Sequence, residues 1–336
     1  MIPQAAIGGD KPLDERRSFG HDRRTLIRSR KFRRAGVENL NHPNHTDVPM
    51  FPCFTVLASG SGGNASLLES AGFGLLVDIG LGPRQLATRL AACGRSWRNI
   101  HAVLLTHTHS DHWRGKALAA LFNRRIPLYC HEEHLDELAA GCPEFVFDRL
   151  HAAGLLRTYS EERAPEFGAA LRCTPLALRH DGGPTFGFRF AGPGDLLSGE
   201  WSLGYLADLG SWDDRLASAL SDVDLLALEF NHDVAMQRSS GRHPMLIARV
   251  LGDEGHLSNE QAAELLREAL CRSIVGRLQQ LVQLHLSRQC NRPSLAQSAA
   301  QSVLNQLGRA VSIHSASQHN PSPPFEFAAA QCATRA

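Results

Sequence analysis

The chain has 336 residues, of which 43% are hydrophobic and 21% are charged, and its net charge at pH 7 is +1. This composition supplies a sizeable core and excludes a wholly disordered protein. No apolar run approaches the ~20 residues of a membrane span, and no apolar N-terminal segment resembles a secretory signal. The cysteines form no Cys-x-x-Cys pair, so we expect reduced thiols and a cytoplasmic protein.

The first 49 residues differ in character from the rest of the chain. They hold 10 Lys and Arg against 6 Asp and Glu, and they show neither a helix nor a strand period. We expect residues 1–49 to be a disordered basic tail. One alternative is that the protein starts at Met50, and another is that the tail binds nucleic acid. Residues 50–336 form the predicted folded domain. That part is slightly acidic, which excludes a broadly basic surface for nucleic acid.

From residue 51 onward, short apolar strands alternate with amphipathic helices. The predicted strands are 54–58, 66–69, 74–77, 102–106, 127–130, 171–178, 187–190, 203–207, 225–229, 281–284 and 310–313. The predicted helices are 86–93, 116–122, 135–140, 259–272 and 295–307. Ser258 is the expected cap of the helix at 259–272. This alternation predicts a layered α/β architecture.

The strongest motif directly follows the strand at 102–106. It places His107, His109, Asp111 and His112 within six positions. Imidazole and carboxylate groups are ligands suited to zinc or manganese. In an extended loop, His107 and His109 point to one side, and the turn that follows brings Asp111 and His112 to a neighbouring position. One short stretch can therefore serve two adjacent metal ions.

This motif resembles that of the metallo-β-lactamase superfamily, whose fold is a four-layer αββα sandwich with metals at one edge of the sheets. The resemblance implies further ligands at later strand ends, and His180, Asp208 and His285 stand at such positions. It implies a dinuclear site with two divalent ions, Zn²⁺ or Mn²⁺, held by His107, His109 and His180 and by Asp111, His112 and His285, with Asp208 bridging them. Asp78, at the end of another strand, is expected to orient a ligand histidine or to cap the next segment.

Five further segments are similar to the YycJ/WalJ branch of that superfamily, over about residues 51–327. They are 58–64 (Ala-Ser-Gly-Ser-Gly-Gly-Asn), 76–80, 231–234, 255–260 and 285–291. The resemblance implies a metal-dependent nuclease with double-stranded DNA exonuclease activity, related to tRNase Z and to cyclic phosphodiesterases. The glycine-rich loop at 59–64 lacks the Lys-Ser/Thr of a phosphate-binding P-loop.

The resemblance to tRNase Z also implies a proton donor. A histidine beside a glutamate protonates the leaving oxygen in such enzymes, and His256 and Glu229 are the candidates here. The alternative is that His256 only caps the helix that follows. Asp111 is expected to orient or deprotonate the attacking hydroxide. Candidates for phosphate contacts, unless they only form a solvated loop, are Ser287, Arg288 and Asn291.

The sequence thus predicts a phosphodiester hydrolase, a nuclease of the DNA exonuclease type with a hydroxide held by two metal ions. DNA is favoured over RNA as the substrate, no membrane partner is expected, and the oligomeric state stays open. One alternative is a hydrolase of the same fold acting on small cyclic phosphodiesters or thioesters. Another is a non-catalytic module of a regulatory complex. The nearly neutral chain counts against a nuclease, because phosphate contacts normally supply affinity for nucleic acid.

Overall fold

The computed structural model describes residues 51–143, 145–193 and 199–327. The predicted tail at 1–49 and the alternative start at Met50 lie outside these residues. Within the described ranges, no helix is long and apolar enough to cross a membrane.

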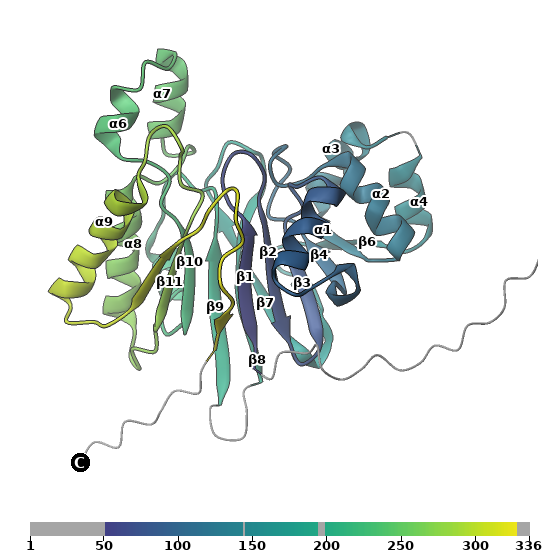
Figure 1. The fold of residues 1–336 in the computed structure, drawn as a ribbon, viewed down its shortest axis with the longest axis horizontal. Helices are drawn as coiled ribbons and strands as arrows, with labels where there is room; N and C mark the ends of the chain where they lie inside the picture. The colour runs from purple at the N-terminus through teal and green to yellow at the C-terminus, as the bar shows by residue number, and fades with distance from the viewer. Residues whose placement is uncertain (1–50, 144, 194–198, 328–336) are drawn as a thin grey trace, which may run out of the picture. The chain divides into compact units, whose positions relative to one another are not determined.

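Two mixed β-sheets face each other at the centre of the described domain (Figure 1). The first sheet, in the order β13-β1-β2-β3-β4-β5-β6, consists of β1 (Cys53–Ala58), β2 (Ala65–Ser70), β3 (Phe73–Val77), β4 (Ala102–Leu104), β5 (Leu128–His131), β6 (Leu156–Tyr159) and β13 (Phe325–Glu326). The second, in the order β12-β11-β10-β9-β8-β7, consists of β7 (Arg172–Leu178), β8 (Thr185–Pro193), β9 (Glu200–Leu206), β10 (Leu225–Glu229), β11 (Gln280–Leu284) and β12 (Ser312–Ser315). Strands β3 to β6 are parallel to one another, and so are β9 to β12.

Helices cover the outer face of each sheet (Figure 1). Beside the first sheet lie α1 (Pro83–Ala92), α2 (Gly115–Arg124), α3 (Leu135–Gly141) and α4 (Val146–Ala152). Beside the second lie α5 (Asp214–Ala219), α8 (Asn259–Arg272) and α9 (Pro293–Gln306). Two further helices, α6 (Val234–Arg238) and α7 (Pro244–Leu251), project beyond the ends of the strands. Short 3₁₀ turns are Trp97–Asn99, Glu132–His134 and Gly168–Ala170.

Three apolar layers hold this arrangement together. Aromatic residues such as Phe54, Phe188 and Tyr205 fill the space between the sheets, and leucines fill the space between each sheet and its helices. All five residues of β10 are buried, as expected for a parallel strand that is covered on both faces. The predicted four-layer αββα sandwich is confirmed.

All eleven predicted strands and all five predicted helices form within a few residues of their expected bounds. The strand predicted at 102–106 ends earlier, at Leu104. Ser258 caps α8 by accepting a hydrogen bond from the backbone N–H of Gln261. Six elements were not predicted from the sequence: α4, α5, α6, α7, β6 and β13. These elements are short, and α7 also exposes the apolar residue Met245 to solvent.

Gly80, just after β3, packs against the segment that carries the histidine motif. A Cβ at Gly80 would lie 1.7 Å from the backbone oxygen of Asp111 and 2.7 Å from the backbone nitrogen of Asn64. The two segments are also joined there, because Ile79 donates its N–H to the His112 carbonyl at 2.8 Å. No side chain fits without moving that backbone.

We therefore expect Gly80→Ala to lower the free energy of unfolding by about 3 kcal/mol, measured by denaturant titration. Gly82→Ala is the matched control, because the nearest atom to its Cβ is a side-chain oxygen of Gln85 at 3.7 Å. The control should stay within about 0.5 kcal/mol of the wild type. Equal stability of the two variants would contradict this account of the packing.

Candidate metal centre

The carboxyl ends of β3, β9 and β11 are each followed, within two residues, by a residue whose backbone is left-handed. Asp78, Asp208 and His285 have φ values of 64°, 59° and 52°. Asp and His tolerate this conformation better than most residues, and such backbone is concentrated at functional sites. Because parallel strands end at a common edge, these turns place three polar side chains together with the loop after β4.

His107, His109 and His180 form a first group, with ring nitrogens within 4.8 Å of one another. His180 Nδ1 lies 2.8 Å from the Gly255 carbonyl oxygen, so Nε2 is left to face His109 Nδ1 at 3.2 Å. His107 Nε2 is buried and has no hydrogen-bond partner in the described part of the chain. Burial lowers the pKa of His107 well below its usual value and also lowers the pKa of His109. Both rings are thus neutral, which is the form that binds metal.

Asp111, His112 and His285 form a second group with the same spacing. Asp78 Oδ2 lies 2.7 Å from His112 Nδ1, while Asp78 Oδ1 accepts the backbone N–H of Thr106 at 2.9 Å. Asp78 therefore fixes the ring of His112 with Nε2 toward the centre. Asp111 Oδ2 lies 3.4 Å from His285 Nε2.

Asp208 lies between the two groups. Its Oδ2 is 2.5 Å from His112 Nε2 and 3.7 Å from His107 Nε2, whereas its Oδ1 is 2.9 Å from His285 Nδ1. Burial acts to raise the pKa of the Asp208 carboxyl, but His285 and His112 outweigh it and hold the pKa well below its usual range. One carboxylate thus faces both sets of histidines with different oxygens.

These residues fit divalent metal ions. Asp78, Asp208 and Glu229 are at most 1% exposed, and buried carboxylates require nearby positive charge. Burial would lower the pKa of His112, yet Asp78 and Asp208 raise it to about 10. Without a metal ion, the His112 ring therefore compensates the charge of these two carboxylates only when it is protonated. Metal ions would supply the charge and leave the imidazoles free to coordinate. The donor set of imidazole nitrogens and carboxylate oxygens suits zinc or manganese.

His256 and Glu229 stand beside this centre. His256 Nδ1 lies 2.8 Å from Glu229 Oε1, and Glu229 Oε2 accepts the backbone N–H groups of Leu209 and Leu257 at 3.0 and 3.3 Å. Burial acts to lower the pKa of His256, but Glu229 and Asp208 outweigh it and raise the pKa to about 9. Since Ser258 caps α8, His256 does not have the alternative capping role.

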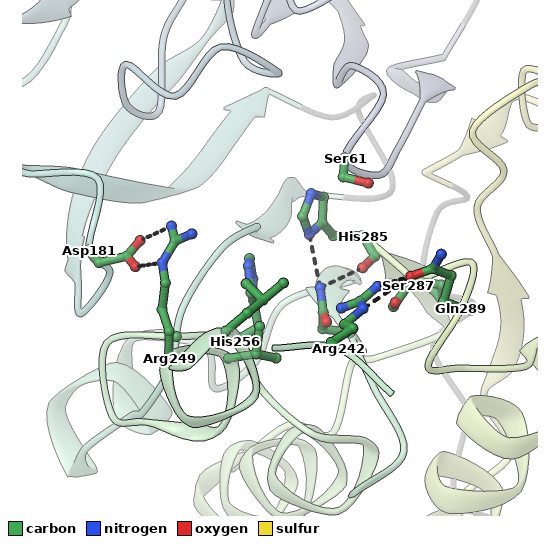
Figure 2. A pocket seen from close by; sticks show the side chains of 13 residues that line it. Ser61, Asp181, Arg242, Arg249, His256, His285, Ser287 and Gln289 are labelled. Carbon is green, nitrogen blue, oxygen red and sulfur yellow. Dashed lines mark hydrogen bonds and ion pairs between the residues drawn. The ribbon is translucent and has the colours of Figure 1, made fainter. Parts of the chain in front are cut away.

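A pocket of about 400 Å³ opens at the centre (Figure 2). It is lined by Ser61, Asp181, Asn231, Arg242, Leu246, Arg249, Val250, Gly255, His256, His285, Leu286, Ser287 and Gln289. Of the three predicted phosphate contacts, only Ser287 belongs to this lining. Arg288 is exposed and does not line the pocket, and Asn291 is buried with its Nδ2 donating to the carbonyl groups of Phe230 and Asn231 at 2.8 and 3.0 Å. These bonds give Asn291 a structural role.

Several residues of the site were not predicted from the sequence. Asn64 Nδ2 lies 2.9 Å from His112 Nε2, and Asn231 Nδ2 donates to Glu229 Oε1 at 3.2 Å. Both asparagines stand in segments that carry the family resemblance, which was an available signal. No motif marks Asp181, Arg242 and Arg249, which reach the pocket from other elements.

Comparison with known proteins finds relatives of this chain. The family model described as β-lactamase superfamily domain matches residues 74–276. The chain is 31% identical over 262 residues to exodeoxyribonuclease WalJ of Streptococcus pneumoniae, covering 76% of this chain and 88% of WalJ. It is 28% identical over 280 residues to exodeoxyribonuclease YycJ of Bacillus anthracis, covering 80% and 97% of the two chains.

A solved structure shares the fold. Zn²⁺-bound PqqB from Methylobacterium extorquens matches with a TM-score of 0.55 at 18% identity, covering 80% of this chain and 99% of PqqB. The family match, the two relatives and the shared fold lead to one conclusion: the chain belongs to the metallo-β-lactamase superfamily of metal-dependent hydrolases.

Proposed function

We propose that this hydrolase is a nuclease that cleaves phosphodiester bonds of DNA as an exonuclease. The observation that carries the proposal is the contact between His256 and Glu229 beside the metal centre. Cleavage of a phosphodiester expels a poorly leaving alkoxide, which needs a proton, and this pair can deliver one. The similarity to two proteins named exodeoxyribonucleases supports DNA as the polymer.

The proposed ligands are those expected from the sequence, and the two histidine groups with Asp208 between them support this assignment. One ion would be held by His107, His109 and His180, and the other by Asp111, His112 and His285, with Asp208 shared. When bound, two divalent ions neutralise phosphoryl oxygens and lower the pKa of water.

The other residues act on protons and orientation. Asp78 holds the His112 ring, and Asp111 orients or deprotonates the attacking water. Glu229 holds His256 through Nδ1, which leaves Nε2 to face the pocket. As the P–O bond to the departing sugar breaks, His256 gives its proton to that sugar oxygen, and the hydroxyl of the water joins phosphorus.

The reaction class is tested by assaying the purified protein with Mn²⁺ or Zn²⁺ in parallel on several substrates. These are linear DNA, RNA, bis-p-nitrophenyl phosphate, a cyclic nucleotide and a thioester. The proposal expects DNA to be degraded from its ends. Hydrolysis of the cyclic nucleotide or the thioester without cleavage of DNA would replace it with a small-molecule activity.

We predict that reconstituted protein binds about two divalent ions per chain, as measured by elemental analysis. Asp208→Ala should lose metal together with activity, because Asp208 contacts both groups of histidines. His151→Ala, an exposed change on α4, is the control and should retain both. Full activity with a single ion per chain is incompatible with the bridging role of Asp208.

For His256→Ala we predict unchanged metal content and a rate on DNA that is lower by about 10²–10⁴-fold. Bis-p-nitrophenyl phosphate should be hydrolysed at nearly the wild-type rate, because nitrophenolate leaves without a proton. Steady-state kinetics on both substrates measure this contrast. Equal slowing on both would assign His256 to positioning, and loss of metal would assign it to the metal site.

A further inference from the structure

Two arginines reach the pocket from the segment of α6 and α7, and they are paired differently. Arg249 forms two contacts with the Asp181 carboxylate, one of them from Nη2 to Oδ1 at 2.9 Å. Arg242 instead donates from Nε and Nη2 to the amide oxygen of Gln289, at 3.0 and 2.7 Å, and from Nη1 to that of Gln237 at 3.5 Å. Among the described residues, no carboxylate forms an ion pair with Arg242, so its positive charge is not compensated.

Other hydrogen-bond donors line the same pocket as Arg242. Gln289 uses its amide oxygen to hold the guanidinium, so its NH₂ group remains to bind something else. The hydroxyl groups of Ser287 and Ser61 also line the pocket. Figure 2 shows Arg242, Ser287 and Gln289 close together, with His256 between them and the Arg249–Asp181 pair. A guanidinium with several neutral donors is suited to a phosphate group.

Part of the remaining lining is apolar, beside the polar residues Asn231 and His285. Leu246 and Val250 of α7 and Leu286 after β11 contribute to the pocket wall. The volume of about 400 Å³ is that of a site for a small ligand, in the range of about 300–1,000 Å³. A single nucleotide, with a phosphate at one end and a flat base at the other, matches a pocket that has a cationic part and an apolar part. A double helix is too large for it.

We propose that this pocket binds one nucleotide of a single DNA strand on the leaving side of the scissile bond, with Arg242 binding the other phosphate of that nucleotide. The proposal rests on the proposed nuclease function. His256 lines the same pocket, so the sugar oxygen that receives its proton belongs to the nucleotide bound there. The phosphate on Arg242 is the one at the far side of that sugar, and it is not cleaved in the same turnover.

This arrangement also explains how a slightly acidic domain binds its substrate. One uncompensated arginine in a recessed pocket, rather than a broad field of positive charge, contacts the second phosphate. Affinity then depends on whether the leaving nucleotide carries that phosphate.

The test uses a DNA dinucleotide, which has one cleavable bond, and two versions of it with an added phosphate at the 5′ or the 3′ end. For the wild type, one of the two added phosphates should lower KM by about tenfold or more with little change in kcat. Arg242→Gln should abolish this gain. The gain is measured within each variant, as the ratio of its KM values without and with the added phosphate, because the unphosphorylated dinucleotide has no second phosphate for Arg242 to bind.

Arg238→Gln is the matched control, since Arg238 is exposed on α6 and is not part of the pocket lining. It should keep the full gain from the added phosphate. Equal losses in Arg238→Gln and Arg242→Gln would mean a diffuse charge effect and would overturn the proposal. So would a gain that persists in Arg242→Gln, or no gain from either phosphate in the wild type. Failure of the wild type to cleave any dinucleotide or longer DNA would instead refute the nuclease function itself.

Discussion

Three buried carboxylates at one edge of the sandwich require positive charge beside them, and the rest of the site provides it. Asp78, Asp208 and Glu229 are sealed from water at strand ends, and each is met by at least one histidine. Removing the positive partner of such a buried charge costs about 3–5 kcal/mol. The stability of this edge and its capacity to bind metal therefore arise from the same contacts.

Neither sheet forms the site alone. The histidine motif follows β4 of the first sheet, whereas Asp208 and His285 follow β9 and β11 of the second. The aromatic layer between the sheets sets the spacing across which these side chains meet. A further contact joins the two sides, because the backbone N–H of His285 donates to Ser59 Oγ at 2.8 Å. Changes in the packing between the sheets will therefore alter the distances at the metal centre.

Secondary structure could be predicted from the sequence where the local residue pattern alone determines the element. Strand β10 is a continuous apolar run, and α8 begins at a serine cap, so both were predicted with their observed bounds. The polar partners across the fold were harder to predict. Asn291 resembled a phosphate contact because it follows His285, but the structure turns it toward backbone carbonyl groups. Arg242 belongs to no motif. Its charge is uncompensated because its hydrogen-bond partners are neutral amide oxygens, and these contacts form only in the folded chain.

The helices α6 and α7 are inserted in the chain between β10 and His256, and they project beyond the strand ends. Helix α7 supplies Arg249 and Leu246 to the pocket, and the short link between α6 and α7 supplies Arg242. None of the residues in the two histidine groups lies in this insertion. Changes in the length or sequence of this insertion, during evolution or by design, can therefore alter the pocket and the substrate that it accepts while the two histidine groups stay the same.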